Sequence, residues 1–324
     1  MIPTPTAKSV LLLRPRGFCA GVVRAIDIVE LALQVYGPPI YVRKEIVHNR
    51  HVVHDLAAKG AIFVDEVEEV PCGERLIYSA HGVGPDVREA AAERDLRIID
   101  ATCPLVTKVH LEALKFAAAG KTILLLGHPD HDEVIGTSAE APERTIVVSS
   151  AEQAEKVRVP DGGVAYLTQT TLSLDETEAI IRVLQQRFPE IEGPPAKDIC
   201  YATENRQQAV KSVAPKADLL LVVGSENSSN SKRLTEVGQL AGTPSHLIND
   251  EEDILPAWLD GIQHVAVTSG ASAPERIVQN VVRHLQACGF GYVQEIETTT
   301  EDLNFPLPPE LRQAQPLTQI STNL

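Results

Sequence analysis

Residues 97–106 read RIIDATCPLV and place Cys103 between a short apolar run and a helix that begins with proline. Cys19 and Cys200 occupy the same kind of setting, and the three cysteines are separated by 84 and 97 residues. The strand-like runs that precede the cysteines are 10–13, 97–99 and, more weakly, 198–199. A segment with helical periodicity follows each cysteine. The spacing therefore predicts three similar α/β lobes, each presenting one thiol at a strand-to-helix corner.

Two further polar clusters recur behind apolar runs at matching distances from each cysteine. The first lies 28 or 29 residues after it, within residues 47–49, 127–131 and 227–230. The second lies 60 to 68 residues after it, within residues 79–82, 168–171 and 268–272. Strands alone would recur in any α/β chain, since a βαβ unit needs roughly 30 residues. Because α/β units bind ligands at the carboxyl ends of their strands, we expect these polar loops to surround the thiols.

The composition excludes several classes of protein. The chain has 324 residues and a net charge of −15, which argues against a broad nucleic-acid surface because phosphate contacts need clustered Lys and Arg. No apolar run approaches the roughly 18 residues needed to span a bilayer. The first ten residues lack the pattern of a signal peptide. With five cysteines and no export signal, we expect a reducing cytoplasm, where widely spaced cysteines serve metal binding or catalysis.

The predicted fold is α/β, a trefoil of three similar lobes followed by a tail. Helices are expected over residues 20–36, from Pro104 to Gly120, and from Tyr201 to before Pro215. Continuous apolar runs at 122–126, 219–223 and 264–268 predict parallel strands covered on both faces. Lobe 1 is expected to span residues 1–102 and to contain Cys19, His48 and His81. Lobe 2 is expected to span 103–195, with Cys103, His131, Glu133 and Thr170. Lobe 3 is expected to span 196–292, with Cys200, Ser228, Asn230 and Ser272, and an extended tail follows at 293–324.

The three repeated cysteines are candidate metal ligands. At a helix N-terminus the pKa of a thiol is expected to fall, which favours the thiolate that binds metals. Zinc would usually require closely paired ligands such as C-x₂-C, which the sequence lacks. Three thiolates suit an iron–sulfur cluster with one position left open. Cys72 and Cys288 lack the strand-to-helix setting and are predicted not to be ligands.

The polar loops supply groups for binding an anion and for moving a proton. No G-x-x-x-x-G-K-[ST] loop is present, so a bound phosphate would be held by short polar side chains and by N–H groups at helix ends. Glu133 is the best candidate for a general acid, and Thr170 and Thr171 could relay a proton. The candidate anion ligands are His48, His81, His131, Ser228, Asn230 and Ser272.

Two other classes of function use the same residues. A non-enzymatic iron–sulfur sensor or scaffold could use the three thiols and would need neither a general acid nor a diphosphate site. A zinc hydrolase could instead take its ligands from the His-rich loops.

The sequence resembles the 4-hydroxy-3-methylbut-2-enyl diphosphate reductase (IspH/LytB) family from residue 9 to about residue 290. In the first lobe the matching stretches read PRGFCAGV at 15–22, EIVHN at 45–49 and SAHGV at 79–83. In the second they read DATCPLV at 100–106, GHPDHDEV at 127–134 and TQTTL at 168–172. In the third they read CYAT at 200–203, NSSNS at 227–231 and GASAPE at 270–275.

The resemblance implies one 4Fe–4S cluster per chain, with an open apical iron and with Cys19, Cys103 and Cys200 as its ligands. It implies that the substrate is (E)-4-hydroxy-3-methylbut-2-enyl diphosphate, reduced by two electrons to isopentenyl and dimethylallyl diphosphate in the last step of the non-mevalonate pathway. An external one-electron donor of the ferredoxin or flavodoxin type is also implied. By matching position, the substrate ligands would be His48, His81, His131, Thr170, Ser228, Ser229, Asn230 and Ser272.

The resemblance also implies that Glu133, with Thr170 and His131, protonates the leaving hydroxyl. One departure lies beside this group, because Asp132 stands where the family usually has proline. A second carboxylate close to Glu133 in a dry site is expected to raise the pKa of Glu133.

Overall fold

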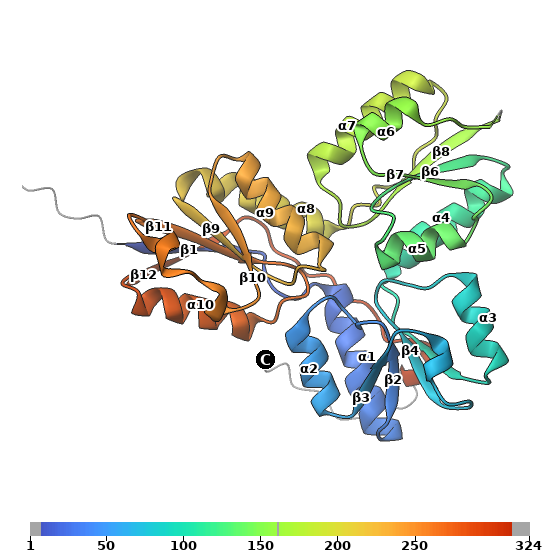
Figure 1. Cartoon of the computed structure of the whole chain (residues 1–324), viewed down its shortest axis with the longest axis horizontal. Helices are drawn as coiled ribbons and strands as arrows, with labels where there is room; N and C mark the ends of the chain where they lie inside the picture. The colour runs from blue at the N-terminus through green and yellow to red at the C-terminus, as the bar shows by residue number, and fades with distance from the viewer. Residues whose placement is uncertain (1–7, 161, 313–324) are drawn as a thin grey trace, which may run out of the picture.

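Three separate parallel sheets divide the chain into three lobes around a common centre, as Figure 1 shows. The structure is a computed structural model that describes residues 8–160 and 162–312. The first sheet has the order β3-β2-β4-β5, the second β7-β6-β8 and the third β10-β9-β11-β1-β12. Their strands are β1 (Ser9–Arg14), β2 (Ile40–Arg43), β3 (Ala61–Val64), β4 (Arg75–Tyr78), β5 (Arg97–Asp100), β6 (Thr122–Leu126), β7 (Thr145–Val148), β8 (Val164–Thr168), β9 (Leu219–Val223), β10 (Ser245–Ile248), β11 (His264–Ser269) and β12 (Tyr292–Glu297).

Helices cover the sheets, as their apolar strands require. The helices are α1 (Ala20–Tyr36), α2 (Arg50–Ala58), α3 (Pro85–Glu93), α4 (Pro104–Ala118), α5 (Asp132–Ala139), α6 (Ala151–Lys156), α7 (Leu174–Arg187), α8 (Tyr201–Val213), α9 (Ser229–Leu240), α10 (Glu275–Ala287) and α11 (Pro309–Arg312). In β1, Val10 and Leu12 belong to one core, whereas Leu11 and Leu13 belong to the core on the opposite face. Of the helices in the described ranges, none is both long enough and apolar enough to cross a membrane.

The predicted α/β trefoil is confirmed, and several elements have the predicted bounds. Helix α1 and strands β6 and β9 begin and end at the predicted residues. The weak strand expected at residues 198–199 is wrong, because this segment is irregular. Its Asp198 is buried and instead accepts hydrogen bonds from the Thr168 backbone N–H and from Lys108 Nζ, each at 2.9 Å.

The predicted lobe boundaries need correction at both ends of the chain. Strand β1 was expected in lobe 1, but it pairs with β11 and β12 in the third sheet. The blue β1 accordingly lies among the orange and red strands in Figure 1. In the third sheet, apolar cores cover both faces of β1, and its two edges pair with β11 and β12.

The segment expected to be an extended tail is partly regular structure. Strand β12 runs along β1 from the pair Ser9 and Tyr292 to the pair Arg14 and Glu297. The chain then returns to lobe 1, where Leu307 and Leu311 pack against its core and α11 lies beside α1. Residues 313–324 of the predicted tail lie outside the described residues.

A buried ion pair fixes this returning segment to the third lobe. The Arg206 side chain is 0% exposed, and its Nη1 donates to Glu301 Oε1 at 3.0 Å and to Oε2 at 3.2 Å. Its Nη2 donates to the Gly17 carbonyl at 2.8 Å. Arg206 therefore connects α8 both to the loop before Cys19 and to the C-terminal segment.

Replacing Glu301 by Gln should lower the free energy of unfolding by about 3 kcal/mol, because it leaves a buried guanidinium without its charged partner. Urea unfolding followed by circular dichroism measures this change. The matched control is Glu297→Gln, an exposed position that should change stability by less than about 0.5 kcal/mol. Equal stabilities of the two variants would contradict the importance of this ion pair.

Candidate functional site

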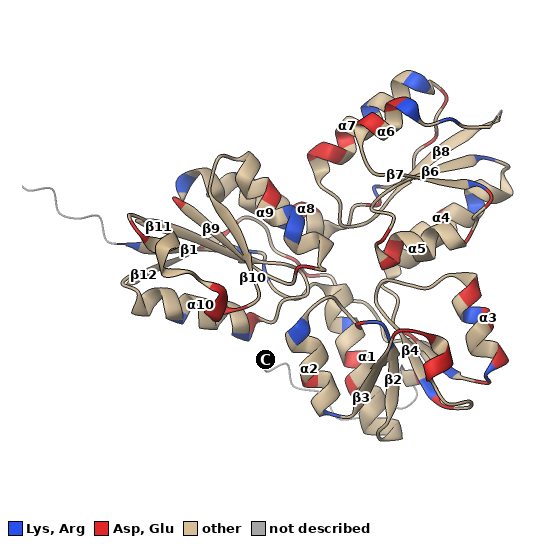
Figure 2. Ribbon diagram, viewed as in Figure 1, with Lys and Arg blue, Asp and Glu red and all other residues tan. Residues whose placement is uncertain are grey.

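A cavity of about 110 Å³ lies where the three lobes meet. Many of the charged residues lie on the helices at the outside of the lobes (Figure 2). All residues predicted for the site line this cavity: Cys19, His48, His81, Cys103, His131, Glu133, Thr170, Cys200, Ser228, Ser229, Asn230 and Ser272. The structure therefore brings the complete predicted set together.

The three cysteines are the N-cap residues of α1, α4 and α8, and all three are free thiols. Each stands where the chain passes from one lobe to the next, which corrects the expectation that each lobe presents its own thiol. Cys19 follows β1 of the third sheet, and Cys103 follows β5 of the first. Because every crossing passes the centre, the three thiols converge there.

Gly21 allows this close approach. A Cβ atom on Gly21 would lie 2.8 Å from Cys103 Sγ and 3.8 Å from Cys19 Sγ. The first distance is below van der Waals contact, so any larger residue would displace the thiols.

The expectation of thiol pKa values below normal is wrong for two cysteines. Burial, together with charge on the neighbouring thiols, raises the pKa of Cys103 to about 12 and that of Cys200 to about 11. Backbone N–H groups at the helix N-termini favour the thiolates but do not outweigh desolvation. These thiols will ionise at neutral pH only beside a positive charge such as a metal.

The polar loops come from adjacent strands in every lobe. His48 and His81 follow the paired strands β2 and β4. His131 and Thr170 follow β6 and β8, while Ser228 and Ser272 follow β9 and β11. The cavity is thus built from the carboxyl ends of three strand pairs, as expected for ligand sites in parallel sheets.

Glu133 is buried near the start of α5 and bonded to Thr170. Its Oε1 accepts from the Thr170 backbone N–H at 2.6 Å, and its Oε2 accepts from Thr170 Oγ1 at 3.0 Å. Desolvation nevertheless raises the pKa of Glu133 to about 7. The carboxylate that also raises this pKa is Asp198, and not Asp132 as expected from their adjacency. Glu133 can therefore hold and release a proton near neutral pH.

Three imidazoles form a cluster opposite the thiols. The rings of His48 and His81 are stacked with their centroids 3.9 Å apart. The His131 ring is edge-on to both, with its centroid 5.5 Å from that of His48 and 5.9 Å from that of His81. Burial, followed by repulsion from neighbouring imidazoles, lowers the pKa of His131 to about 3 and that of His81 well below its ordinary value. Both rings are therefore neutral in the ligand-free protein.

The third lobe contributes hydroxyl and amide groups at the N-terminus of α9. Ser228 caps this helix, and its Oγ accepts from the Ser231 backbone N–H at 3.4 Å. Asn230 Nδ2 donates to Thr203 Oγ1 at 3.2 Å, and Ser272 Oγ donates to the His48 carbonyl at 3.0 Å. A helix N-terminus with such donors favours an anion.

Sequence reasoning assigned no role to several residues around the cavity. Thr203 Oγ1 lies 3.2 Å from Cys200 Sγ, and its backbone N–H donates to that sulfur at 3.4 Å. The N-cap position of Cys200 could have indicated this contact, because N-cap side chains accept from the N3 backbone N–H. Phe305 also lines the cavity but belongs to the returning C-terminal segment, where no periodicity marked it.

Three parallel α/β lobes around free thiols, imidazoles and one buried carboxyl group define a class of α/β protein whose central cavity combines candidate metal ligands with a buried acid. The chain belongs to the LytB protein family, which it matches over residues 10–286. It is 56% identical over 313 residues to the 4-hydroxy-3-methylbut-2-enyl diphosphate reductase of Mycolicibacterium paratuberculosis, covering 96% of this chain and 94% of the relative. The relative of the same name from Acidothermus cellulolyticus is 55% identical over 327 residues, covering 99% and 96%.

Solved structures agree with this assignment. The E-1-hydroxy-2-methyl-but-2-enyl-4-diphosphate reductase from Plasmodium falciparum is 42% identical, with a TM-score of 0.92 over 95% of this chain and 98% of that one. A second structure, described as (E)-4-hydroxy-3-methyl-but-2-enyl diphosphate reductase, the terminal enzyme of the non-mevalonate pathway, is 30% identical with a TM-score of 0.60. It covers 86% of this chain and 99% of its own.

Replacing Thr170 by Val should raise the pKa of Glu133 by about one unit, because it removes a hydroxyl that donates to the ionised form. Infrared difference spectroscopy of the protonated carboxyl group measures this pKa, with Glu133→Gln used to assign the band. Thr170→Ser keeps the hydroxyl and is the matched control. An unchanged pKa in Thr170→Val would show that the backbone N–H alone sets it.

Proposed function

We propose that this chain catalyses the two-electron reductive dehydroxylation of (E)-4-hydroxy-3-methylbut-2-enyl diphosphate to isopentenyl and dimethylallyl diphosphate. Membership of the LytB family and the shared name of relatives at 55–56% identity support this function. The observation that carries the proposal is the convergence of three free thiols, the Glu133–Thr170 pair and three imidazoles on one cavity. No single lobe contains this set.

The residues present fit a 4Fe–4S cluster held by Cys19, Cys103 and Cys200. Three soft donors line one cavity, and Gly21 leaves the space that a Cβ atom would take from two of them. The high pKa values of Cys103 and Cys200 indicate that these thiolates need a positive partner. When bound, such a cluster supplies single electrons and a Lewis-acidic iron.

The diphosphate would be held by polar side chains and a helix N-terminus instead of by fixed cations. No Lys or Arg is among the residues lining the cavity of the described chain. His48 and His81 approach from lobe 1, while Ser228, Asn230 and Ser272 approach from lobe 3. Their donors, together with the α9 N-terminus, offer charge-assisted hydrogen bonds to phosphate oxygens. Ser229, His131 and Thr170 complete the proposed contacts.

Glu133 would supply the proton that lets the hydroxyl leave as water. Burial keeps this carboxyl group protonated near neutral pH, and Thr170 fixes its orientation through two hydrogen bonds. The reaction breaks one C–O bond, takes up two electrons and two protons, releases water and forms a new C–H bond at either end of the allylic unit. His131 lies at the N-cap of α5, where its Nδ1 accepts from the Glu133 backbone N–H at 3.2 Å. It therefore positions the acid.

The electrons would come singly from an external donor of the ferredoxin or flavodoxin type. Mössbauer spectra of anaerobic ⁵⁷Fe-reconstituted protein, with and without the allylic diphosphate, test the whole assignment. We expect one distinct iron whose signal shifts when the substrate is added. A cluster without this response would favour an iron–sulfur sensor, and stoichiometric zinc without sulfide would favour a hydrolase.

Replacing Cys103 by Ser should abolish cluster binding and turnover, because one of three soft ligands is lost. Iron and sulfide analysis after anaerobic purification measures the first effect, and product formation measures the second. Cys72→Ser is the matched control, since Cys72 is exposed in a distant turn and should change neither. A full cluster in Cys103→Ser would refute the ligand assignment.

Glu133 should act in its protonated form, so kcat/KM should fall as pH rises. With a pKa of about 7, the protonated fraction falls about tenfold for each pH unit well above that value. Glu133→Gln cannot donate a proton and should lower kcat by about 10²–10⁴-fold. The alkaline limb of the pH profile, in which kcat/KM falls as pH rises, should also be lost. Asp130→Asn, an exposed neighbour, should keep the limb. Unchanged turnover in Glu133→Gln would disprove the proton-donor role.

A further inference from the structure

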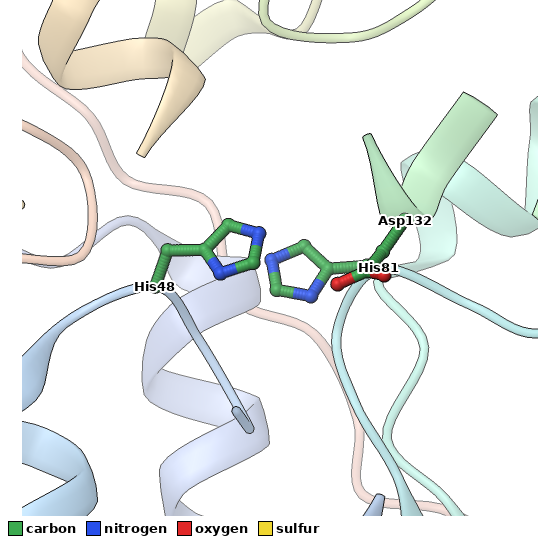
Figure 3. Close-up of side chains that lie close together, drawn as sticks. All are labelled: His48, His81 and Asp132. Carbon is green, nitrogen blue, oxygen red and sulfur yellow. The ribbon is translucent and has the colours of Figure 1, made fainter. Parts of the chain in front are cut away.

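We propose that His48, His81 and Asp132 form a binding site for a divalent transition metal, with Zn²⁺ as the ion that fits best. One ligand atom from each of these residues lies within 4.8 Å of the others. Figure 3 shows the two rings facing each other, with the Asp132 carboxylate beside His81. Two imidazole nitrogens and one carboxylate oxygen suit zinc, whereas Mg²⁺ and Ca²⁺ prefer oxygen ligands.

Hydrogen bonds engage one nitrogen of each imidazole and leave the other nitrogen available to a metal. His48 Nδ1 donates to Glu45 Oε2 at 3.2 Å, and Asn227 Nδ2 holds the same oxygen at 2.7 Å. His81 Nδ1 shares a hydrogen bond of 3.2 Å with the Ser79 hydroxyl. In metal sites, the ring nitrogen that does not bind the ion is commonly held in this way. The Nε2 atom of each ring is therefore the one directed to a metal.

Asp132 supplies the one carboxylate of the group. Within residues 8–160 and 162–312, it forms no hydrogen bond or ion pair with another side chain. It stands at the first position of α5 in lobe 2, whereas both histidines belong to lobe 1. A bound ion would therefore connect these two lobes. A metal bound to an imidazole lies in the plane of the ring, so zinc bonds of about 2.0–2.2 Å require the stacked His48 and His81 rings to turn out of their stack.

Occupation of this site should inhibit turnover, an effect that rests on the proposed function. The metal would take the two imidazoles that would otherwise hold the substrate diphosphate. Glu133 and the three cysteines are not members of the group, so zinc would block the substrate site without replacing the iron–sulfur cluster.

Zinc binding to the anaerobic, cluster-loaded protein tests the site without any need for turnover. Calorimetry should give one equivalent of zinc, with affinity reduced at least tenfold in Asp132→Asn and unchanged in the matched control Asp130→Asn. The zinc K-edge spectrum should show nitrogen and oxygen ligands at about 2.0–2.2 Å and no sulfur near 2.3 Å. Equal affinity in the two variants, a sulfur ligand, or absence of binding would overturn the proposal.

Activity assays separate this inference from the proposed function. We expect one equivalent of Zn²⁺ to inhibit the wild-type protein and to leave Asp132→Asn largely active. Zinc bound by nitrogen and oxygen ligands in a protein that never reduces the allylic diphosphate would support the metal site and contradict the proposed function. Zinc inhibition that is equal in wild type and Asp132→Asn would contradict the site.

Discussion

The passage of the chain through the centre of the molecule is the constraint on which the site depends. The first three crossings between lobes each end in a cysteine at the N-cap of the next helix, so the covalent path itself brings Cys19, Cys103 and Cys200 together. Gly21 keeps the space between two of these thiols open. The parallel direction of every strand pair then directs the loops of all three lobes toward the same point. The positions of the cysteines and of the polar loops in the site thus depend more on the topology of the chain than on the local sequence.

Burial at this centre favours the neutral forms of five ionisable groups. It raises the pKa values of Cys103, Cys200 and Glu133 and lowers those of His81 and His131. These opposite shifts have one cause, because desolvation disfavours the charged form of acids and bases alike. Neutral forms of these groups avoid the cost of buried, unpaired charge. Under the proposed function, charge enters this region together with the cofactor and the diphosphate.

Local patterns predicted local structure well. The bounds of α1 and β6 follow from apolar periodicity, a glycine stop and a continuous apolar run, all visible in the chain itself. The lobe to which β1 belongs could not be predicted, because its partners β11 and β12 lie more than 250 residues away. The thiol pKa values were wrong for a related reason: the helix N-terminus is a sequence feature, whereas burial depends on the assembled lobes. The repeat of cysteines and polar loops predicted the site residues, but it contained no sign of Phe305 or of the contact between Asp198 and Thr168.

No Lys or Arg lines the cavity in the described chain, so under the proposed function the imidazoles would supply the basic groups that bind the anion. A permanent cation in this dry space would need a permanent partner, and it would also stabilise the ionised form of Glu133. A neutral imidazole needs no charged partner and does not stabilise the ionised form of Glu133. A diphosphate placed beside His81 and His131 would favour their protonated forms. Proton uptake would then accompany binding, and the positive imidazolium groups would pair with the negative diphosphate. In the proposed metal site, His48 and His81 supply the imidazole ligands and Asp132 supplies the single carboxylate, so a cation site would lie beside the anion site.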